Sequence, residues 1–142
     1  MAQEPTVWWP EPEAGDIVWC HFPHLPKFDP GPKPRPALIV RVEERAQAQQ
    51  GYRVFVAYGT SQKTQSLHKG ELLLRNDQSS AYQLSGLSFD TKFSFANSVE
   101  LDFSSKWFKI RSTLENAQTP KTGILHSVYA KAACAAYLAI YP

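Results

Sequence analysis

The sequence predicts a β-dominated α+β domain, with a small, strongly curved antiparallel sheet or partly open barrel and one C-terminal helix. Three early segments, 16–20, 37–42 and 52–58, are rich in the β-branched and aromatic residues typical of strands. The last part of the chain instead has apolar residues at spacings of three and four, which is the period of a helix. With 142 residues, 43% of them hydrophobic and 20% charged, one domain with a real core is expected.

Shorter strands are expected after these three, at residues 72–74, 93–95 and 99–103. Residues 43–51 (EERAQAQQG) are interpreted as the turn of a long hairpin in which Gly51 takes a positive φ; a short helix is the alternative. Residues 23–36 hold six of the eleven prolines and are therefore expected to form a stiff loop.

A single domain is predicted over residues 1–142, with an N-terminal extension at 1–14, the barrel at 15–110 and the C-terminal helix at 120–141. Thr119-Pro120 is a suitable helix start. The apolar positions expected to face the sheet are Leu125, Val128, Ala132, Ala135 and Ala139. In the extension, Trp8 and Trp9 are expected to cover one end of the barrel.

Charge, the N-terminal sequence and the cysteines bear on the partners, location and metal binding of the protein. The net charge of +2 does not by itself indicate a nucleic-acid partner, because clustering on one face matters more than the total. The start MAQEP has no signal-peptide pattern, so a cytoplasmic protein is expected; the polar residues within 124–141 predict a docked helix and no membrane span.

Cys20 and Cys134 are far apart and are expected to be buried, reduced thiols. Cys20, His21 and His24 lack a fourth ligand at a supporting spacing, so neither a metal nor a cofactor is predicted.

An arginine and a threonine lie at the ends of neighbouring predicted strands. Arg35 begins the segment RPALIV, whereas Thr60 and Ser61 close the segment VFVAYGTS. A guanidinium and a hydroxyl that meet at a sheet edge can hold a phosphate without a metal. The alternatives are a surface ion pair for Arg35 and an ordinary hydroxyl-to-backbone turn for Thr60.

Five short motifs occur together in one order: GDIVW at 15–19, RPALIV at 35–40, TS at 60–61, GL at 86–87 and NSV at 97–99. Over roughly residues 14–110 they resemble the MazF/PemK family of toxin endoribonucleases. The resemblance implies an SH3-like barrel, usually a homodimer, that cuts single-stranded RNA and is held inactive by a cognate antitoxin. It matches Arg35 and Thr60 to the catalytic arginine and threonine of the family. Operator DNA would be bound only through the antitoxin.

Cleavage of this kind uses the 2′-hydroxyl of the substrate as nucleophile and leaves a cyclic phosphate. The protein must align the substrate, handle protons and stabilise charge on the phosphorane. Arg35 suits charge stabilisation and protonation of the leaving 5′-oxygen, and Ser61 can share the work of Thr60. Of the loop histidines, His24 is the first candidate for general base, with a surface histidine as the alternative.

The loops beside these residues carry groups suited to RNA. Lys27 and Lys33 are expected to touch phosphates, and Phe28 to stack on a base. Gln62 and Lys63 add donors for the RNA backbone or base edges, unless they belong to a merely solvated loop.

Three other classes of function stay open at this point. A non-catalytic SH3-like binding module, or a toxin that acts on a protein target as the CcdB branch does, would use the same barrel without needing Arg35 and Thr60 together. In the third class, residues 23–26 (PHLP) would form a proline-rich ligand displayed to another domain.

Overall fold

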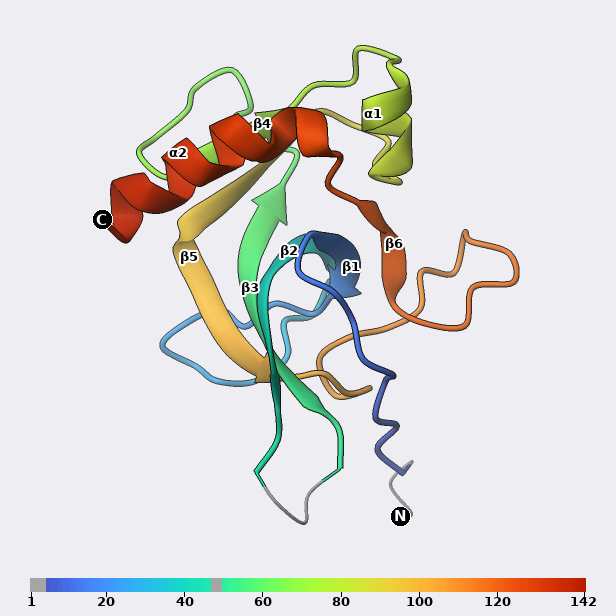
Figure 1. Cartoon of the computed structure of the whole chain (residues 1–142). Helices are drawn as coiled ribbons and strands as arrows, with labels where there is room; N and C mark the ends of the chain where they lie inside the picture. The colour runs from blue at the N-terminus through green and yellow to red at the C-terminus, as the bar shows by residue number, and fades with distance from the viewer. Residues whose placement is uncertain (1–4, 47–49) are drawn as a thin grey trace.

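The computed structural model describes residues 5–46 and 50–142, and its main feature is one six-stranded antiparallel sheet that curls into a half-barrel (Figure 1). Along the sheet the order is β4-β5-β3-β2-β1-β6. The strands are β1 (Asp16–Cys20), β2 (Arg35–Glu44), β3 (Tyr52–Thr60), β4 (Glu71–Leu74), β5 (Thr91–Asp102) and β6 (Lys121–Ile124). The helices are α1 (Ser80–Leu84), the 3₁₀ turn η1 (Ser127–Tyr129) and α2 (Ala130–Ile140). The predicted β-dominated class with a C-terminal helix is confirmed.

Both faces of the sheet are buried, which explains the nearly continuous apolar runs of the central strands. Successive side chains of a strand point to opposite faces. In β1, for example, Val18 joins a cluster with Phe103 and Phe108, whereas Ile17 joins a second cluster with Phe93. Residues of α2 pack against the second cluster, and the helix lies across the sheet there (Figure 1).

The hairpin between β2 and β3 is confirmed, because the two strands pair in antiparallel register out to Glu44 and Tyr52. Gly51 has the expected positive φ, at 95°. The alternative of a short helix falls on residues 47–49 and lies outside the described residues.

The two strands expected at 93–95 and 99–103 are wrong, since they form the single bent strand β5. Its register against β3 jumps from Ser94, opposite Tyr58, to Ser98, opposite Ala57. The three residues between them have no partner on β3, so β5 bends there and the sheet curls (Figure 1).

The expected helix over 120–141 is also wrong in its first ten residues. Residues 121–124 form β6, which pairs with the edge of β1 and satisfies the backbone groups there. Of the residues expected to face the sheet, Leu125 does pack on the second cluster, but Val128 is 66% exposed. Ala132 and Ala135 are also exposed.

The sheet is instead contacted by another face of α2, which includes Tyr137 and Ile140. The ring of Tyr137 meets the ring of Phe95 edge-on, at 5.7 Å between centroids. These larger side chains bury more apolar area than the alanines do and therefore orient the helix. Cys134 is consequently exposed, against expectation, whereas Cys20 is buried as expected.

Trp8 and Trp9 of the N-terminal extension both contact the rest of the domain. Trp9 contacts the first cluster and donates its indole N–H to the carbonyl of Phe108 at 3.1 Å. The guanidinium of Arg45 lies over the ring of Trp8, with 4.0 Å between Cζ of Arg45 and the ring centre. Within the described residues, no helix combines the length and the apolar character that a membrane crossing requires.

Candidate functional site

Arg35 and Thr60 lie just beyond the last pair of β2 and β3, at the same end of the two strands. Ala37 pairs with Tyr58, and continuing that register by two residues brings the first residue of β2 to the last residue of β3. A Cβ atom on Gly59 would lie 2.5 Å from the carbonyl oxygen of Pro36, so the two strands approach closely here.

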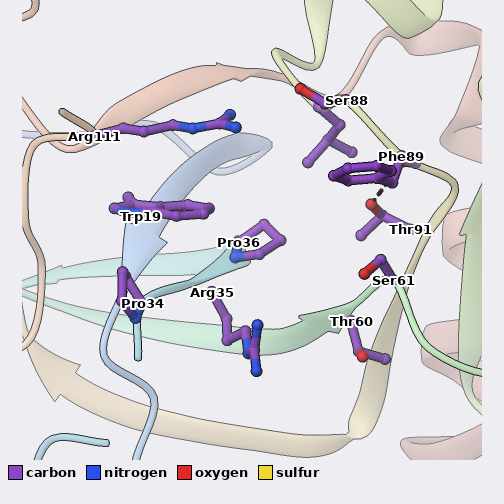
Figure 2. A pocket seen from close by; sticks show the side chains of 11 residues that line it. Trp19, Pro34, Arg35, Pro36, Thr60, Ser61, Ser88, Phe89, Thr91 and Arg111 are labelled. Carbon is purple, nitrogen blue, oxygen red and sulfur yellow. Dashed lines mark hydrogen bonds between the residues drawn. The ribbon is translucent and has the colours of Figure 1, made fainter. Parts of the chain in front are cut away.

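Both side chains line one open cavity of about 150 Å³, which we call the Arg35 cavity. In Figure 2, Trp19 and Arg111 lie to the left, Phe89 and Ser61 lie to the right, and Arg35 and Thr60 lie below them. Antiparallel pairing collects these residues, because β1 and β3 end where β2 and β5 begin. The predicted site residues Arg35, Thr60 and Ser61 are therefore brought together.

Arg35 is half-buried. Among the residues that the structure describes, no carboxylate pairs with it, so the surface ion pair proposed as its alternative is not found. A guanidinium held without a counter-ion keeps its fork of N–H donors for an anion from solution.

The hydroxyl of Thr60 accepts a hydrogen bond from the backbone N–H of Gln62 at 3.1 Å. The hydroxyl-to-backbone turn is thus present, and it fixes the side chain at the cavity wall. Accepting this bond uses a lone pair of the oxygen and leaves the O–H proton for another acceptor. The turn and a phosphate-binding role are therefore compatible.

A second cavity, of about 140 Å³, adjoins the first and holds two more of the predicted residues. His24 and Lys33 line it together with Arg35 and Tyr58, so Arg35 separates the two cavities. The loop that carries His24 is closed at its base, where Nδ1 of His21 lies 2.8 Å from the carbonyl oxygen of Gly31. His24 thus shares a cavity with Arg35 but not with Thr60.

The remaining predicted residues line neither cavity. Phe28 packs edge-on against Trp107, with 5.0 Å between ring centroids, although half of its surface is exposed. Lys27, Gln62 and Lys63 are exposed on the flanking loops. Lys63 has a positive φ of 54°, within a tight turn closed by the N–H of Ser66.

Positive charge is concentrated around the site although the net charge of the chain is small. The loops 21–34 and 61–70, with Arg35 between them, carry Lys27, Lys33, Lys63 and Lys69 against the single carboxylate Asp29. Local excess of this kind attracts an anionic ligand.

A buried ion pair anchors the loop that follows Thr60. Nζ of Lys92 lies 3.1 Å from a carboxylate oxygen of Glu71 and donates to the carbonyl of Ser66 at 2.9 Å. Burial raises the pKa of Glu71, but the backbone N–H of His68 and the ammonium of Lys92 outweigh this and hold it below its ordinary value. Because Lys92 pairs across the sheet with Thr60, the loop is fastened directly beside the site.

Two residues of the Arg35 cavity, Phe89 and Arg111, were missed by sequence reasoning. Cζ of Arg111 lies 4.8 Å from the ring centre of Trp19, which belongs to β1. The only local signals were an aromatic residue in the turn GLSFD and a pair of cations at 109–111. Neither signal indicates a position in space.

Neither a metal site nor a known relative assigns a function to these residues. Over residues 5–46 and 50–142, no group of three or more His, Cys, Asp or Glu side chains could hold a metal ion. The chain matches no protein-family model, and no match was found among curated proteins. A function must therefore be argued from the residues of the site.

Proposed function

We propose that this protein is a metal-independent endoribonuclease toxin of the MazF/PemK type, an SH3-like barrel that cleaves single-stranded RNA in the cytoplasm. The observation that carries the proposal is the convergence of Arg35 and Thr60 on one open cavity. The excess of lysine on the surrounding loops supports an anionic ligand.

In the proposed reaction, the scissile phosphate lies against Arg35. The guanidinium donates two N–H groups to the non-bridging oxygens, and the hydroxyl of Thr60, assisted by Ser61, donates to one of them. The 2′-oxygen forms a bond to phosphorus while the bond from phosphorus to the 5′-oxygen breaks, which leaves a 2′,3′-cyclic phosphate. The proton of the 2′-hydroxyl passes to His24, and Arg35 supplies a proton to the leaving 5′-oxygen.

The two cavities on either side of Arg35 suit this arrangement. A strand whose phosphate rests on Arg35 can place one neighbouring nucleoside in the Arg35 cavity and the other toward His24 and Lys33. Unpaired RNA satisfies this geometry because its bases can splay apart, whereas the bases of a duplex stay stacked.

The experiment is cleavage of single-stranded RNA by the purified protein in EDTA, with the new ends analysed for cyclic phosphate. Arg35→Ala and Thr60→Ala should each lower the rate by about 100-fold or more, because each removes a donor to the transition state. His24→Ala should lower it as well. The matched control is Arg53→Ala, at the other end of β3, where Arg53 forms only exposed ion pairs with Glu100 and Asp102.

Uncut RNA from the folded wild-type protein would refute the proposal, as would cleavage that EDTA abolishes. Cleavage that survives in both Arg35→Ala and Thr60→Ala would refute the assignment of the site.

A non-catalytic module that binds single-stranded RNA is the second candidate. It is favoured by one observation: among the described residues that line the Arg35 cavity, none carries an imidazole or a carboxylate to accept the proton. Such a module would bind RNA in a manner sensitive to Arg35 and leave it intact. The same incubation, followed by a binding measurement, separates the two candidates.

The resemblance adds two partners to the proposal, a second copy of the chain and a cognate antitoxin. An acidic, initially disordered antitoxin segment would block RNA by occupying the basic surface around Arg35. Operator DNA would be bound only through that antitoxin. Sedimentation velocity tests the homodimer, and competition between an acidic peptide and RNA tests the mode of inhibition.

A further inference from the structure

Phe89 is an aromatic side chain held in solvent at the mouth of the Arg35 cavity. The residue is 69% exposed. The backbone beneath it is nevertheless fixed, since its carbonyl oxygen accepts a hydrogen bond from Oη of Tyr82 at 2.7 Å. The same oxygen accepts a second one from Oγ1 of Thr91 at 2.9 Å (Figure 2). The ring is thus positioned at the cavity without being buried in the core.

Arg111 is a second planar group in the lining of the cavity, at the upper left of Figure 2, where Phe89 is at the upper right. Its guanidinium stacks on Trp19, and Nη1 donates to the carbonyl of Gly86 at 3.1 Å. No carboxylate pairs with it within the part of the chain that the structure describes. The stack and the hydrogen bond fix the plane of the fork and leave further N–H donors for a ligand.

Together these side chains indicate a flat ligand with an aromatic face and hydrogen-bond acceptors on its edge. A phosphate or carboxylate would use Arg111 but gain nothing from the ring of Phe89. An aliphatic side chain would contact Phe89 and leave the guanidinium without a partner. A nucleobase uses both, and a cavity of about 150 Å³ is large enough for one six-membered ring.

We infer that Phe89, Arg111 and Trp19 form a binding site for one unpaired nucleobase, adjacent to the phosphate held by Arg35. The inference rests on the proposed function in taking single-stranded RNA as the ligand. Phe89 stacks on the face of the base, and Arg111 donates to its edge. These residues therefore help to select where the strand is placed, whereas Arg35 and Thr60 act on the phosphate.

The test is a binding measurement with short 2′-fluoro RNA oligonucleotides, which lack the 2′-hydroxyl nucleophile and so separate binding from cleavage. In a series of these oligonucleotides, one base at a time is replaced by an abasic sugar, and affinities are measured by fluorescence anisotropy. For the wild type, one position should stand out, where loss of the base weakens binding about ten-fold. For Phe89→Ala, the intact oligonucleotide should bind about ten-fold more weakly, and the abasic change at that position should have no further effect.

Two further variants make the test specific. Arg111→Lys keeps the charge but loses the planar fork, so it should also weaken binding at that one position. Leu84→Ala is the matched control, because Leu84 is 49% exposed on α1 and does not line the cavity. It should bind every oligonucleotide as the wild type does.

Each outcome decides the inference separately from the proposed function. The base site is overturned if Phe89→Ala binds the oligonucleotides as tightly as the wild type does. It is also overturned if the loss of affinity in Phe89→Ala adds to that of the abasic change at every position. Either result overturns it even in a protein that cleaves RNA. If the wild type binds no RNA, both are overturned. If the coupling between Phe89 and one base is found in a protein that does not cut RNA, the base site stands and the nuclease proposal fails.

Discussion

Replacing Gly59 by alanine tests whether the close approach of β2 and β3 holds the site together. The added Cβ would lie 2.5 Å from the carbonyl oxygen of Pro36 and 2.7 Å from Cε1 of Phe93. Neither neighbour can easily yield, since one belongs to the backbone of β2 and the other to a ring that is fully buried. The two strands must therefore move apart beside Arg35 and Thr60.

Two opposing effects determine how far Gly59→Ala lowers the free energy of unfolding. Overpacking of this kind destabilises a protein by about 1–3 kcal/mol, whereas the loss of glycine flexibility in the unfolded chain returns roughly 0.4–1 kcal/mol. We expect a net loss of about 1–2 kcal/mol, which lowers the melting temperature by roughly 3–8 °C in a domain of this size. A displacement approaching 1 Å at the site can lower the cleavage rate by about 100-fold.

The assay compares thermal unfolding, followed by circular dichroism, with the RNA cleavage rate at 25 °C. The matched control is Gly15→Ala, whose Cβ would meet nothing within 4 Å but whose φ of 96° strains any other residue. It should lose a comparable stability, about 1–2 kcal/mol, and keep its activity. Cleavage at the wild-type rate in Gly59→Ala, or an equal loss of activity in both variants, would refute the reasoning.

Two more predictions follow from buried groups. Because the pKa of Glu71 is lowered in the folded protein, its carboxylate stabilises the fold above its ordinary pKa, and that contribution is lost as the pH falls through the folded value. When the free energy of unfolding is measured in urea, it should therefore fall less in Glu71→Gln than in the wild type as the pH is lowered from about 5 to about 3. An equal fall in both proteins would contradict this. Burial also raises the pKa of the Cys20 thiol far above its ordinary value, whereas Cys134 is exposed. Iodoacetamide should label only Cys134 in the native protein and both in urea, as peptide mass spectrometry can show; native labelling of Cys20 would count against the fold.

The strands were predictable because their signal is local. Runs such as 37–40 (ALIV) contain side chains for both buried faces, and each run can be read without knowing its neighbours. The end of the chain was not predictable in the same way. Residues 121–124 become a strand because the edge of β1 offers backbone partners, and α2 turns Tyr137 toward the sheet because Phe95 lies there. Such effects of neighbours are absent from periodicity.

By itself, the sequence determined the β-rich class, the hairpin of β2 and β3, and the candidate pair Arg35 and Thr60, since strand propensity and the order of short motifs are properties of neighbouring residues. Only the tertiary structure decided that Trp19, Phe89 and Arg111 share a cavity with that pair. These three residues are separated by up to 92 positions in the chain. Their meeting depends on the order and curl of the sheet, which are set by contacts between distant strands.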